Sequence, residues 1–150
     1  MGRLAASLVL LCLWSVIPTV GAQPLSITVA PGAVGMTLQV VTPGDSLRAS
    51  DGGSRLTWYD RRGGPRFSKV TVSTVCPGQR YALRVTALGV VNGTPTGTVE
   101  LIDGLPERDL VLNIAHRVDG SSMLRYDAAA SPADGRGPET HVVTYTFTRQ

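Results

Sequence analysis

Apolar and polar residues alternate with a period of two along most of this chain, and short turns rich in glycine and proline interrupt the alternation. This pattern is typical of strands that turn one face to a core and the other to solvent. In the clearest segment, residues 80–87, inward positions are predicted for Tyr81, Leu83, Val85 and Ala87 and outward positions for Arg80, Arg84 and Thr86. Strands are predicted at residues 25–29, 34–42, 55–59, 67–75, 80–87, 98–102, 110–115, 123–126 and 141–148.

No segment predicts a helix, and turns are expected where aspartate precedes glycine, as at residues 51–53 and 119–120. Period-two alternation with one polar face favours antiparallel sheets that pack face to face. We therefore expect an all-β fold. It should be an antiparallel β-sandwich, immunoglobulin-like or jelly-roll, of about eight or nine strands.

The first 22 residues differ from the rest of the chain. Arg3 is followed by an almost unbroken apolar stretch over residues 4–17, and small residues precede a cleavage site after Ala22. This is the pattern of a secretory signal peptide. As a helix, the apolar stretch would span about 21 Å, which is short of a hydrocarbon core of roughly 30 Å. We predict a signal peptide at residues 1–22 and a single β-sandwich domain at residues 23–150.

This leader predicts a protein that is secreted, periplasmic or on the cell surface, with no membrane span after cleavage. Of the two cysteines, Cys12 leaves with the leader, so Cys76 has no partner for an internal disulfide. Cys76 either lies in the core as a small apolar residue, which we favour, or pairs between chains. A strong preference for arginine over lysine suggests a GC-rich, bacterial genome.

Composition and charge exclude several functions. The net charge of +3 is too small for a surface built to bind nucleic acid, and 43% hydrophobic residues exclude disorder.

His116 and His141 each stand alone in the sequence and are predicted to be exposed or to cap a strand. The acidic pairs Asp103 with Glu107 and Asp134 with Glu139 are expected in turns. The sequence therefore predicts a non-enzymatic protein with no catalytic, metal or cofactor site.

The segment Trp58–Lys69 concentrates aromatic and basic residues around a glycine-rich turn. Aromatic rings stack on sugars, and arginines bind anionic groups, so this segment is a candidate ligand surface. Its residues are Trp58, Tyr59, Arg61, Arg62 and Arg66. The alternative, which we favour, is a core tryptophan followed by a solvated loop.

Both ends of the predicted domain are alternating strands. Leu25, Ile27 and Val29 share one face of the first strand. Val143, Tyr145 and Phe147 share one face of the last strand. In this respect the chain resembles small exported bacterial fibre subunits, the chaperone–usher pilins and the related spore-coat-U-like domains. That resemblance implies that the N-terminal strand of one subunit completes the sandwich of its neighbour by strand addition.

The match to this family is partial. The family places a glycine about fourteen residues before the C-terminus, where this chain has Gly137. It places an aromatic residue next to last, where this chain has Arg149, with Phe147 two residues earlier. The disulfide that the family often carries is missing.

We expect a secreted or cell-surface structural protein, such as a fibre, matrix or envelope subunit, with β-strand addition as its candidate mode of assembly. Its expected partners are further copies of itself or other envelope and extracellular proteins, and not nucleic acid. The alternative function is an extracellular module that binds carbohydrate or another surface through the aromatic and basic segment Trp58–Lys69.

Overall fold

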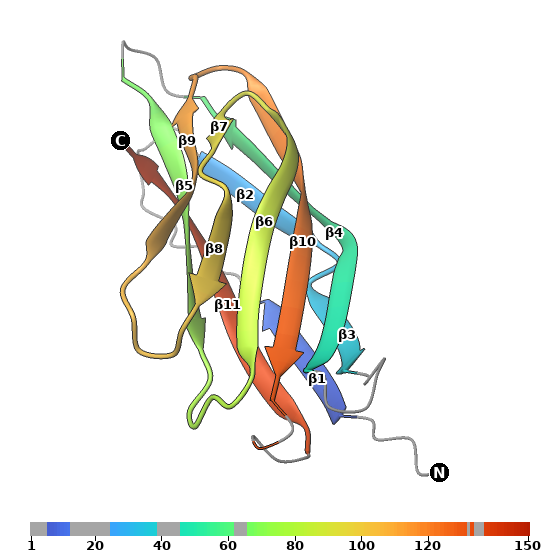
Figure 1. Cartoon of the computed structure of the whole chain (residues 1–150). Helices are drawn as coiled ribbons and strands as arrows, with labels where there is room; N and C mark the ends of the chain where they lie inside the picture. Colours follow the sequence, from blue (N-terminus) through green and yellow to red (C-terminus); the bar gives the residue numbers. More distant parts are fainter. Residues whose placement is uncertain (1–5, 13–24, 39–45, 62–65, 132, 134–136) are drawn as a thin grey trace.

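The computed structural model describes residues 6–12, 25–38, 46–61, 66–131, 133 and 137–150, and for residues 6–12 the backbone alone. The fold is all-β, as the alternating pattern predicts, and two sheets pack face to face (Figure 1). Among the described residues, no helix has the length and apolar character needed to cross a membrane.

Each sheet combines strands from distant parts of the chain. The six-stranded sheet has the order β3 (Ala33–Leu38), β1 (Ala6–Cys12), β11 (Glu139–Arg149), β5 (Ser68–Val75), β9 (Arg108–Ile114) and β7 (Thr94–Pro95). The five-stranded sheet has the order β2 (Leu25–Ala30), β4 (Leu47–Asp60), β10 (Asp119–Ala130), β6 (Ala82–Val91) and β8 (Thr98–Leu101). Two of these strands, β1 and the two-residue β7, were not predicted from the sequence.

The core lies between the two sheets and is formed by the inward residues of both. Tyr81, Leu83 and Val85 are almost completely buried, whereas Arg80 and Arg84 are exposed, so the predicted inward and outward faces are confirmed. Thr86 differs from the prediction. It is buried, and its hydroxyl lies 2.9 Å from the hydroxyl of Thr98 on the neighbouring strand β8, which gives the buried hydroxyl a hydrogen-bond partner.

The predicted turn at Asp51–Gly53 is wrong, because these residues lie inside β4. Strand β10 pairs Leu124 with Ser54 but Tyr126 with Asp51, so β4 has one extra residue at this point. The two glycines therefore form a β-bulge, where a bend replaces the expected reversal. The amide of Gly53 donates a hydrogen bond to the Asp51 carboxylate at 3.1 Å.

The turn predicted at residues 119–120 is also wrong, because Asp119 begins β10 and Gly120 pairs with Trp58 on β4. A Cβ atom at Gly120 would lie 2.0 Å from Nε1 of Trp58. Glycine is needed here because the indole ring covers the backbone of the neighbouring strand.

Leu83→Ala tests the core assignment. Because Leu83 is fully buried, we expect the free energy of unfolding to fall by about 2–5 kcal/mol. Arg84→Ala on the exposed face is the control and should change it by less than about 0.5 kcal/mol. Urea denaturation of both variants checks this, and equal effects would contradict the assigned faces.

Gly120→Ala tests the close contact with Trp58. The added methyl group has no space, so we expect a loss of about 1–3 kcal/mol in unfolding free energy. Gly52→Ala in the bulge is the matched control, because a Cβ atom added there would meet no other residue within 4 Å. A thermal melt that shifts equally for both variants would contradict this packing.

Candidate functional site

Strand β1 occupies a slot between β3 and β11 (Figure 1). It runs antiparallel to β3, from Ala6 opposite Leu38 to Leu11 opposite Ala33. It runs parallel to β11, from Leu8 opposite Glu139 to Cys12 opposite Val143. The residues of β1 belong to the predicted signal peptide, and the other residues of that segment lie outside the described part of the chain.

Both walls of the slot carry core residues. Val34, Met36 and Leu38 of β3 are buried, and so are Val143 and Tyr145 of β11. Among the described strands, β1 is the only partner of β3 within its sheet. Without β1, the backbone groups of β3 and of the facing edge of β11 would therefore lose their hydrogen-bond partners.

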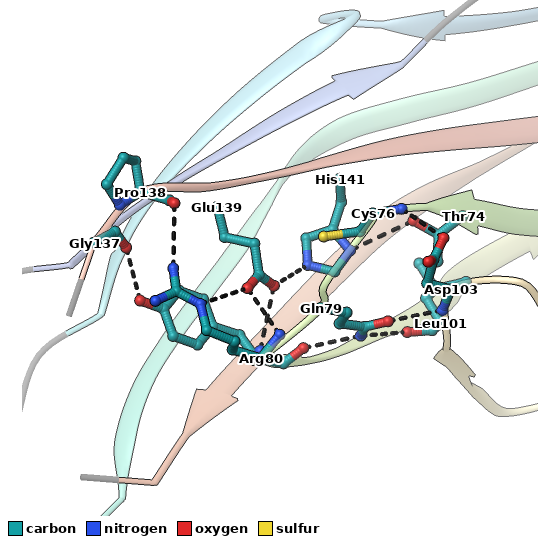
Figure 2. Close-up of polar contacts among 11 residues, drawn as sticks. Thr74, Cys76, Gln79, Arg80, Leu101, Asp103, Gly137, Pro138, Glu139 and His141 are labelled. Atoms are coloured by element: carbon teal, nitrogen blue, oxygen red, sulfur yellow. Dashed lines mark hydrogen bonds and ion pairs between the residues drawn. The ribbon is translucent and has the colours of Figure 1, made fainter. Parts of the chain in front are cut away.

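The first residue of β11, Glu139, anchors this strand to the chain that precedes β6 (Figure 2). One carboxylate oxygen accepts the amide of Arg80 at 2.9 Å, and the other accepts the amide of Tyr81 at 3.2 Å. The Tyr81 hydroxyl donates to the carbonyl of Gly137 at 2.7 Å. The two amide bonds compensate for the burial of the carboxylate of Glu139, a residue that is only 7% exposed.

Two further groups that bind metals or act as nucleophiles face the same carboxylate. Nε2 of His141 lies 2.8 Å from Oε1 of Glu139, and Nδ1 lies 3.4 Å from the hydroxyl of Thr74. Cys76 follows β5 and is buried, and its amide donates to Asp103 at 2.8 Å. Cys76, Glu139 and His141 bring their sulfur, oxygen and nitrogen ligand atoms within 4.8 Å of one another.

Burial controls the ionisation of this cluster. Desolvation, and then the charge of Glu139, raise the pKa of the Cys76 thiol from 9.0 to about 11. Desolvation also lowers the pKa of His141 below 6.5, although the neighbouring Glu139 acts in the opposite direction. At neutral pH the thiol is therefore protonated and the imidazole is neutral, which does not suit an activated nucleophile.

A second buried cluster joins the end of β4 to β5. Asp60 accepts the hydroxyl of Ser68 at 2.7 Å, and Nε2 of His116 lies 3.3 Å from Asp60 and 3.4 Å from Ser68. A serine–histidine–aspartate relay needs the carboxylate and the hydroxyl on opposite ring nitrogens. Here both contact the same nitrogen, so the relay geometry is not formed.

The terminal strands lie in different sheets. Leu25 and Ile27 are half-buried and Val29 is buried, and β2 pairs with β4 of its own chain at one edge of the five-stranded sheet. Val143, Tyr145 and Phe147 are buried on β11. In this single chain the two predicted assembly strands are therefore not paired with each other.

The described aromatic and basic residues of Trp58–Lys69 do not form one surface. Trp58 is 2% exposed and its indole donates to the carbonyl of Asn92, so its ring belongs to the core, as the favoured alternative predicts. Tyr59 is half-buried with the Arg61 guanidinium 5.4 Å from its ring centre, and Arg66 is exposed. Arg62 lies outside the described residues.

Sequence reasoning missed the cluster of Cys76, Glu139 and His141. His141 lies within β11 and is fully buried, so it neither caps a strand nor is exposed. His116 follows the end of β9 and its side chain is only 5% exposed. Glu139 lies in a strand rather than a turn. Its partner in the predicted acidic pair, Asp134, lies outside the described residues. The available signal was the spacing of Glu139 and His141, two residues apart in one strand and hence on the same face.

No family model and no curated protein matches this chain. The site must therefore be interpreted from its own geometry.

The burial of His141 predicts how stability depends on pH. Its folded-state pKa lies below its unfolded value of 6.5, so its contribution is complete above that pH and is lost as the pH falls. We expect His141→Gln to lose less unfolding free energy than the wild type between pH 7 and pH 5. Urea denaturation in metal-free buffer measures this, and equal losses in both proteins would contradict it.

Proposed function

We propose that this protein is an exported structural subunit that assembles by β-strand addition, and that the slot between β3 and β11 receives a strand from a second copy. The observation that carries the proposal is the occupant of this slot. It is filled by residues 6–12, which belong to the predicted leader. Cleavage after Ala22 would remove β1 and open both walls of the slot.

A slot opened in this way is a strong acceptor for a strand. The inward residues of β3 and β11 already form part of the core, so an incoming strand finds an apolar surface beneath it. It would also find unpaired backbone groups on both sides, whereas a strand at a sheet edge is paired on one side only. Binding in the slot therefore forms one hydrogen-bonded ladder more than binding at an edge.

The donor that fits this proposal is the segment 24–30 of the next copy. In its own chain, β2 is an edge strand paired only with β4 among the described strands, and Leu25 and Ile27 are half-buried. In the slot of a neighbouring copy, this strand would lose its one hydrogen-bonded ladder with β4 and form two ladders, one with β3 and one with β11 of the neighbour. The alternation of Leu25, Ile27 and Val29 with polar residues allows one face to enter the core while the other remains in solvent.

Sedimentation of the chain that begins at residue 23 tests assembly. We expect this chain to form polymers, and the full chain of 150 residues to remain monomeric because β1 fills the slot. Ile27→Asp should abolish assembly, since it would place an unpaired charge in the apolar slot. Thr28→Asp, on the opposite face of the same strand, is the control and should still assemble.

A peptide of residues 24–30 added in excess should shorten the polymers by occupying free slots. Circular dichroism must confirm that each variant is folded, because Ile27 also packs against the core of its own chain. A folded wild-type chain from residue 23 that stays monomeric at high concentration would contradict the proposal. In that case β2 remains in its own sandwich, and Ile27→Asp should only lower the melting temperature.

A further inference from the structure

The buried cluster at the start of β11 offers three kinds of metal ligand at one point. Glu139 and His141 are two residues apart on β11, so both side chains turn inward. Val142 pairs with Val75 of β5. This pairing brings Cys76, the residue after Val75, beside Glu139 and His141. The side chains converge from β11 and from the residue that follows β5, and none of the three residues is more than 7% exposed.

We propose that Cys76, Glu139 and His141 bind one zinc ion. Tetrahedral zinc takes thiolate, imidazole and carboxylate ligands at about 2.0–2.3 Å, which places ligand atoms about 3.4 Å apart. The ligand atoms of the cluster already lie within 4.8 Å of one another. Closing them around an ion would need side-chain rotations that bring the most distant pair of ligand atoms from at most 4.8 Å to about 3.4 Å.

The charges around the cluster favour a cation. Two carboxylates face Cys76: Asp103, which accepts its amide, and Glu139. The balancing charge in the described surroundings is the Arg80 guanidinium, 3.6 Å from Glu139 and half-exposed. A divalent ion would displace the proton of the Cys76 thiol to solvent and form a sulfur–metal bond. The two positive charges of the ion, together with Arg80, would then balance the negative charges of the thiolate, Glu139 and Asp103.

The existing hydrogen bonds support the ligands in both states. Without metal, Nε2–H of His141 donates to Glu139 and Nδ1 accepts from the Thr74 hydroxyl. With metal, Nε2 binds the ion and Nδ1–H donates to the same hydroxyl, because a hydroxyl can donate or accept. Glu139 keeps the amides of Arg80 and Tyr81 and exchanges only its bond to the imidazole.

An open groove lies beside the cluster. An open groove of about 400 Å³ is lined by Arg80, Tyr81 and Asp103, each of which belongs to or adjoins the hydrogen-bond network of the cluster. Because the protein supplies three ligands, a tetrahedral zinc ion would take a water molecule as its fourth ligand.

Cobalt is the probe for this site, because Co²⁺ bound to a thiolate absorbs in the near ultraviolet. The full-length, reduced protein should develop this band with one Co²⁺ per chain, and Zn²⁺ should abolish it. Cys76→Ser should remove the band, and His141→Gln should weaken Co²⁺ binding at least about 10-fold. The matched controls, Cys12→Ser and His116→Gln, should bind as the wild type does.

Two further readouts separate a zinc site from a packing role. Zn²⁺ should raise the melting temperature of the wild type but not of Cys76→Ser or His141→Gln. Calorimetry at neutral pH in two buffers should detect one proton released per ion, from the Cys76 thiol. If Cys76→Ser does not fold, His141→Gln and the wild-type melting shift decide the question.

A wild type with no cobalt band and no zinc-dependent melting shift would overturn this proposal, as would a band that persists in folded Cys76→Ser. Both measurements are made on the full chain, whose slot is filled by β1. They therefore succeed or fail independently of assembly by strand addition.

Discussion

A strand inside a sheet needs a hydrogen-bonding neighbour on each side, and this constraint governs the six-stranded sheet. β11 is held on one side by β5 along most of its length. On the other side it depends on β1, which also provides the pairing of β3 within this sheet. Within this sheet, β3 is therefore joined to β11 by one seven-residue strand from a segment that carries the features of a cleavable leader.

The polar cluster and the slot lie along the same strand. Glu139 and His141 pair through their backbones with Leu8 and Leu10 of β1, while their side chains turn inward to Cys76. Glu139 also joins β11 to the chain before β6, which belongs to the other sheet. The beginning of β11 thus connects the slot, the buried cluster and both layers of the sandwich.

The period-two pattern of the sequence was sufficient to predict the all-β fold class and many of the core residues. It placed Tyr81, Leu83 and Val85 inside and the flanking arginines outside, because alternation is a local property of an extended chain. It failed at Asp51–Gly53, where a dipeptide pattern typical of turns forms a bulge. The extra residue is visible only when β4 is aligned with its partner β10.

The sequence by itself determined that this chain forms mainly antiparallel sheets with a sandwich core, and that its first segment differs from the rest. The tertiary structure decided which strands are neighbours, and therefore that β1 lies between β3 and β11. It also decided that Cys76 meets a histidine and a glutamate more than 60 residues away in the chain. The physical reason is that alternation depends on adjacent residues, whereas pairing and side-chain convergence depend on contacts between distant strands.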